Sequence, residues 1–134
     1  MKRFSKLLML IIFILAVWLI YYFFTNTSKL HEPVNLNDVE SIIIWGQTNR
    51  LANSAEKQDI INWFNSTTDI RQNRDFAGTT PESGIVIKLK MRSDILILKS
   101  GTDFEVQRTN SSGKHISYWG RQSNIRNILY RISL

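Results

Sequence analysis

Residues 7–24 form an uninterrupted apolar run, LLMLIIFILAVWLIYYFF, that follows three basic residues, Lys2, Arg3 and Lys6. As an α-helix this run would be about 27 Å long, which is close to the hydrocarbon thickness of a bilayer. A helix also satisfies its own backbone hydrogen bonds, as any segment in lipid must. The sequence therefore predicts a transmembrane helix from Leu7 to Phe24, with the lipid bilayer as its partner.

The end of this run favours a retained signal anchor over a cleaved signal peptide. A cleavable signal ends in small residues, whereas this run ends in the aromatic residues from Tyr21 to Phe24. Basic residues precede the run and only Lys29 follows it closely, so the positive-inside rule keeps the N-terminus in the cytoplasm. We therefore expect a single-pass protein of the cell membrane with an extracytoplasmic C-terminal domain.

The chain is expected to have four parts. Residues 1–6 form a cytoplasmic basic leader, 7–24 the anchor, 25–37 a polar linker that contains Pro33, and 38–134 an exported domain. The part after the anchor, about 110 residues, is long enough for one domain with a modest core.

Charge and cysteine content limit the function of the exported part. The chain has 17 Lys and Arg, 11 Asp and Glu, and no cysteine. Three of the basic residues belong to the leader, so the remaining excess is small and scattered and does not favour nucleic acid as a partner. The lack of cysteine excludes disulfides and thiolate chemistry and favours a bacterial surface. The layout is similar to that of many small surface proteins of Gram-positive bacteria, a likeness that carries no functional residues.

Apolar spacing predicts an α+β domain after the linker. A helix is expected at 55–64 with Ser54 as its N-cap, and a second helix from Ser123 onward. We expect an antiparallel sheet of about four to six strands with the two helices packed on one face. Strands are predicted at 40–45, 50–52, 84–91, 95–99, 103–108 and 115–119, with 69–75 as either an edge strand or a loop.

The sequence carries no metal, cofactor or catalytic motif. The two histidines, His31 and His115, have no carboxylate at ligand spacing beside them. Asp103 and Glu105 would lie about 7 Å apart on one strand face, a spacing that glycoside hydrolysis tolerates. On a solvent-facing strand, ion pairs with lysines such as Lys88 are favoured over a catalytic pair. We therefore expect a protein that is not an enzyme and holds no cofactor and no metal.

The candidate interaction surface is centred on Trp119. Strand alternation places Trp119 on the face opposite Tyr118, and aromatic residues beside arginine are favoured in protein interfaces. We therefore name Arg108, Trp119 and Arg121 as the candidate contact residues, with the unpaired edge at 69–75 as an alternative. The remaining large aromatics of the domain are expected in its core: Trp45, Trp63 and Tyr118.

These observations favour a non-enzymatic binding domain that contacts an envelope protein. Two alternatives stay open. The first is an envelope enzyme that acts on cell-wall or lipid-linked glycan, which requires a cleft with two carboxylates. The second is an immunity-like inhibitor that protects its host from an exported toxin.

Overall fold

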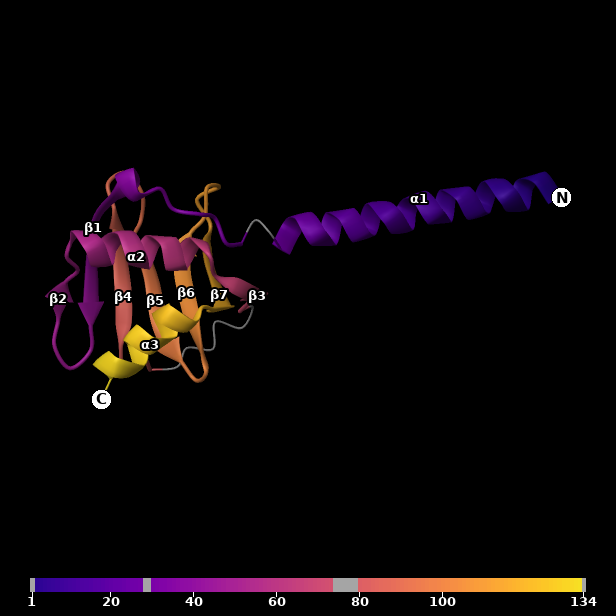
Figure 1. Cartoon of the computed structure of the whole chain (residues 1–134). Helices are drawn as coiled ribbons and strands as arrows, with labels where there is room; N and C mark the ends of the chain where they lie inside the picture. The colour runs from indigo at the N-terminus through magenta and orange to yellow at the C-terminus, as the bar shows by residue number, and fades with distance from the viewer. Residues whose placement is uncertain (1, 28–29, 74–79, 134) are drawn as a thin grey trace. The chain divides into compact units, whose positions relative to one another are not determined.

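The computed structural model describes residues 2–27, 30–73 and 80–133. The chain divides into two compact units, Met1–His31 and Glu32–Leu134. Figure 1 labels the helices and strands of each unit. The two units are described separately below.

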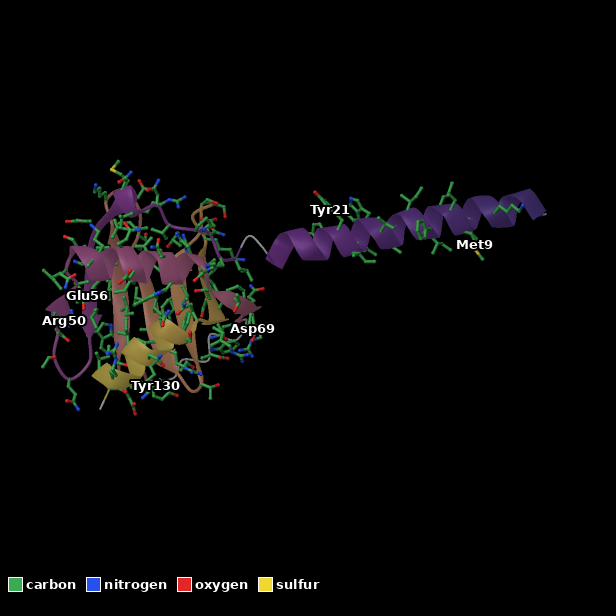
Figure 2. All side chains as sticks on the ribbon, in the orientation of Figure 1. Met9, Tyr21, Arg50, Glu56, Asp69 and Tyr130 are labelled. Carbon is green, nitrogen blue, oxygen red and sulfur yellow. The ribbon has the colours of Figure 1, made fainter. Side chains whose placement is uncertain are left out.

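The first unit consists largely of α1 (Lys2–Thr27), a helix of 26 residues. Side chains along α1 are described at 6 and 8–22, and the large apolar ones among them are 47–73% exposed. Met9 and Tyr21, labelled in Figure 2, mark this stretch. Across the described parts of the chain, no helix is long and apolar enough to cross a membrane.

This finding contradicts the predictions that were based on the apolar run. It overturns the transmembrane signal anchor from Leu7 to Phe24, the fold class that included it, and the single-pass localisation in the cell membrane. The prediction counted all of 7–24 as one apolar span. Among the described residues, no helix provides an apolar span that is long enough to cross a membrane.

The second unit is built on one antiparallel sheet of seven strands in the order β2-β1-β4-β5-β6-β7-β3. Strands β4 to β7 follow one another as a meander, β1 pairs with β4, and β3 pairs with β7. The described strands exceed the predicted four to six because β3, in the segment predicted as either an edge strand or a loop, also joins the sheet. The strands are β1 (Val39–Trp45), β2 (Arg50–Leu51), β3 (Thr68–Gln72), β4 (Gly84–Leu89), β5 (Ile95–Ser100), β6 (Asp103–Thr109) and β7 (His115–Arg121).

Helices α2 (Ser54–Asn65) and α3 (Ser123–Ile132) cross the same face of the sheet, as Figure 1 shows. Helix α2 begins with a capping box, because Asn53 accepts from the backbone N–H of Glu56 and the Glu56 side chain accepts from the Asn53 N–H. The cap is therefore one residue before the expected Ser54. Gln122 caps α3 by accepting from the backbone N–H of Ile125.

The hydrophobic core lies between the sheet and these two helices. Strand alternation sends one set of side chains toward the helices, and these are almost fully buried. Tyr118, Phe64 and Phe104 are the largest fully buried side chains. They pack with the isoleucines at 42, 44, 60, 61, 85, 87, 95, 97 and 125.

Residues 32–34, which the sequence analysis assigned to the linker, pack on the domain. Val34 is 7% exposed, and its backbone N–H and carbonyl both bond to the Asn65 side chain at the end of α2, at 2.8 and 2.9 Å. Arg108 Nη1 donates to the Glu32 carbonyl at 2.7 Å. The domain therefore begins near residue 32, several residues before the expected start at 38.

Candidate binding face of the sheet

A row of side chains crosses the sheet on the face away from α2 and α3. Tyr118 and Val106 are buried on the helix side, so their neighbours Trp119 and Glu105 point to the other face. Strand register aligns the rest of the row with these two residues. From β3 to β1 the row reads Arg71, Trp119, Glu105, Leu98, Gly84 and Trp45.

Large apolar side chains dominate this face. Trp45 and Trp119 are half-buried near the two ends of the row, and Leu98 between them is 7% exposed. The neighbouring row adds Ile43, Val86 and Leu96, each half-buried. We call this surface the Trp face and define it by Ile43, Trp45, Val86, Leu96, Leu98, Glu105, Gln107, Ser117 and Trp119.

Glu105 is a buried carboxylate within this apolar surface. It is 2% exposed, and its Oε1 accepts from Ser117 Oγ at 2.6 Å and from Gln107 Nε2 at 3.0 Å. Asn73 Nδ2 is a more distant third donor at 3.4 Å. All three donors are neutral, and among the described residues no lysine or arginine forms an ion pair with Glu105.

Asn73 brings a second acceptor to the same place. The residue is 1% exposed, and its backbone N–H donates to the Ser117 carbonyl at 3.0 Å. Its side-chain Oδ1 is buried and receives no hydrogen bond from any described residue. Buried polar atoms are normally hydrogen-bonded, so this oxygen is an exception that needs an explanation.

A ring of four charges lies beside Trp119 at the β3 end of the sheet. Asp103 accepts from Arg71 and from Arg121 Nε, the latter at 3.1 Å. Asp69, labelled in Figure 2, closes the ring with ion pairs of 3.9 Å to Arg71 and 3.4 Å to Arg121. Hydrogen bonding to Asp103 raises the pKa of Arg121, and the charges of Asp103 and Asp69 raise it further. Both arginines of this ring are therefore already paired with carboxylates.

The structure separates the three predicted contact residues. Trp119 and Arg121 share one face of β7 because they are two residues apart. Arg108 is 2% exposed and has the same parity as Phe104 and Val106, so it lies on the helix side. It is held there by the Glu32 carbonyl and lies 3.6 Å from the Glu32 carboxylate. Arg108 is therefore part of the domain's interior and not of the Trp face.

The charge of Arg108 also lowers the pKa values of two neighbouring groups, Tyr118 and Glu32. Burial raises the pKa of Tyr118 to about 12, although Arg108 opposes this rise. Burial also raises the pKa of Glu32, but hydrogen bonds from Ser111 and the charges of Arg108 and Arg92 outweigh it, so this pKa is below its usual value. Glu32 is therefore an ionised anchor for the start of the domain.

The acidic pair on β6 is divided between two environments. Asp103 binds Arg71 and Arg121, whereas the sequence analysis expected lysines of the neighbouring strand as partners. Glu105 binds neutral donors. Sequence reasoning noticed Glu105 as half of a pair but missed its burial and missed Asn73, which no local pattern marks. Among the described residues, no three His, Cys, Asp or Glu side chains lie together in a way that could hold a metal ion.

A cavity of about 290 Å³ lies on the other side of the sheet, between α2 and α3. Its charged rim includes Arg50 and Glu56, which Figure 2 labels near β2 and α2 and which form two hydrogen bonds of 2.8 Å. Hydrogen bonding to Arg50 lowers the pKa of Glu56. These rim groups therefore satisfy each other. The other lining residues are Asp59, Ile60, Trp63, Ile128, Arg131 and Ile132.

No family model, curated protein or solved structure matches this chain. The candidate site therefore rests on the geometry of the Trp face.

Proposed function

We propose that the domain Glu32–Leu134 is a non-enzymatic binding module that contacts a protein partner through the Trp face. The observation that supports this proposal is the row between Trp45 and Trp119, which places half-buried apolar side chains on the sheet face away from both helices. Contiguous apolar surface of this kind is typical of interaction sites, and tryptophan is enriched among residues that dominate binding energy.

The shape of this surface supports a protein as the occupant. A sheet face presents side chains from several neighbouring strands at once, which suits a broad contact with another protein surface. Glu105 and Asn73 add polar groups at its centre, so the face combines an apolar surround with specific hydrogen-bonding positions. A protein partner with an apolar patch and a matching polar group fits this arrangement.

Site-specific crosslinking tests the proposal. The photoreactive residue p-benzoylphenylalanine is placed at Leu96 on the Trp face, and at the exposed Gln58 of α2 as the matched control. We expect the Leu96 probe to yield a recurrent protein adduct in cells that make the full chain. The Gln58 probe should not yield that adduct.

Two substitutions connect the adduct to the tryptophans. Trp119→Ala should reduce the Leu96 adduct about tenfold or more, as expected for a residue that dominates an interface. Trp63→Ala changes a half-buried tryptophan at the α2–α3 cavity and should leave the adduct in place. An adduct of equal strength at Gln58, or one that survives Trp119→Ala in a folded chain, contradicts the proposed face.

A further inference from the structure

Glu105 and Asn73 place two hydrogen-bond acceptors together at the centre of the Trp face. The three described hydrogen bonds to the Glu105 carboxylate all end on Oε1 and none on Oε2. Asn73 Nδ2 lies 3.4 Å from that carboxylate, so the unpartnered Oδ1 of the same amide belongs to the same small region. The site thus has acceptors that the described donors leave unused.

The described charges around Glu105 favour a cation as the partner of its carboxylate. Burying a carboxylate with only neutral donors is costly, because the charge loses its hydration without gaining a counter-charge. The nearby Arg71 and Arg121 are bound in the ring with Asp69 and Asp103. This ring has two positive and two negative members, so among the described residues no cation compensates the charge of Glu105.

We infer that Glu105 and Asn73 form a recognition site for a cationic side chain of the partner, either a lysine or an arginine. This inference rests on the proposed function of the Trp face. A cationic N–H group donates to Oε2 of Glu105 and to Oδ1 of Asn73 and supplies the missing counter-charge. Trp119 lies directly opposite Glu105 on β7 and offers an aromatic ring next to the cation.

Entry of the cation requires the Gln107 side chain to move away from Glu105. It is half-buried, it follows Glu105 by two residues on the same strand face, and its Nε2 occupies Oε1 at 3.0 Å. Its outward rotation would break this hydrogen bond to Oε1 of Glu105. Because the Glu105 carboxylate is 2% exposed, the inferred site requires this movement before a partner can reach it.

Peptide selection followed by substitution of the peptide tests the inference, because its main comparison is made on the wild-type chain. A phage-displayed random peptide library is selected on the full chain, and phage that also bind the Trp119→Ala chain are removed. A mild non-ionic detergent is present because the exposed apolar side chains of α1 would otherwise associate. We expect the selected peptides to carry lysine or arginine beside apolar residues.

Each selected peptide is then compared with its neutral analogue, norleucine for lysine and citrulline for arginine. We expect the wild-type chain to bind the charged peptide about tenfold or more tightly than the neutral one. The Glu105→Gln chain should bind the two peptides within about threefold, because the charge coupling is lost. Glu40→Gln removes an exposed carboxylate of β1 and should keep the tenfold preference.

The outcomes separate this inference from the proposed function. Peptides that require Trp45 and Trp119 but bind equally in charged and neutral form overturn the cation site and leave the binding face in place. Charge preference that persists in Glu105→Gln also overturns the site. Selected peptides that bind the Trp45→Ala chain as well as the wild-type chain count against the binding face itself. A library from which no peptide remains after removal of the phage that bind the Trp119→Ala chain also counts against it.

Discussion

The indole of Trp45 lies directly over Gly84 of the neighbouring strand. A β-carbon at Gly84 would be 2.5–2.7 Å from Nε1, Cε2 and Cζ2 of the indole, closer than real β-carbons approach other atoms. The two residues are direct partners in the β1–β4 register. Because Gly84 has no side chain, the indole of Trp45 can lie flat on β4 at this end of the Trp face.

Gly84→Ala should destabilise the domain by about 1–3 kcal/mol, because the new methyl group displaces the indole of Trp45. In a Trp45→Ala background the same substitution should be neutral or slightly stabilising, since alanine is favoured over glycine within a strand. Urea unfolding of the four chains measures this coupling. An equal cost of Gly84→Ala in both backgrounds would show that the indole is not what the methyl group meets.

Glu32→Gln should destabilise the domain at pH 7 and much less at low pH. The folded-state pKa of Glu32 is below its ordinary value of 4.5, so its ionised form is favoured by folding. This stabilisation is complete above pH 4.5 and is lost as the pH falls through the lower folded-state value. Urea midpoints of wild type and variant from pH 7 to pH 3 check the trend. A difference that stays constant over this range would contradict it.

Asp103→Asn should cost about 1–2 kcal/mol, more than Asp69→Asn. The Asp103 side chain is 13% exposed and binds two arginines, whereas Asp69 is 44% exposed and has only longer contacts. Exposed ion pairs contribute little, so Asp69→Asn should change stability by less than about 0.5 kcal/mol. Unfolding in urea at low salt and in 1 M NaCl measures both variants, and salt should reduce the difference. An equal loss of unfolding free energy in the two variants would contradict the larger contribution expected of Asp103.

A chain of residues 32–134 should unfold at the same urea concentration as the domain in the full chain, because the unit Glu32–Leu134 is compact without α1. A chain of residues 35–134 should be less stable by about 2–4 kcal/mol. It loses the Arg108–Glu32 contacts, the two bonds between Val34 and Asn65, and the buried side chain of Val34. Equal stability of the two fragments would refute the role assigned to residues 32–34.

Most of the individual elements of the domain could be predicted because their signals are local. Strand alternation and the cap near Ser54 placed the helices and the later strands within a few residues of those observed. The pairing of β3 with β7 could not be predicted, because it joins segments that are about 50 residues apart. No pattern within residues 68–72 indicates which distant strand they pair with.

The candidate site was predicted only in part for the same reason. Alternation alone placed Trp119 on the face opposite Tyr118, where the register puts it. Arg108 was grouped with Trp119 although it shares its parity with Val106, and its burial depends on Glu32, which is far away in the chain. The membrane prediction was based on the length and apolarity of 7–24 and on the basic residues before it, and it is contradicted because no described helix is long and apolar enough to cross a membrane.

The two edges of the sheet have a consequence for how this domain meets other molecules. One edge is β2, which is only two residues long. The other edge is β3, where the pairing shifts register between Thr68 and Arg71 and Asp69 has a φ of 53°. Short or bulged edges with charged side chains resist the addition of a further strand. Neither described edge therefore favours backbone pairing with a strand of another molecule, so the contact proposed for the Trp face would be made by side chains.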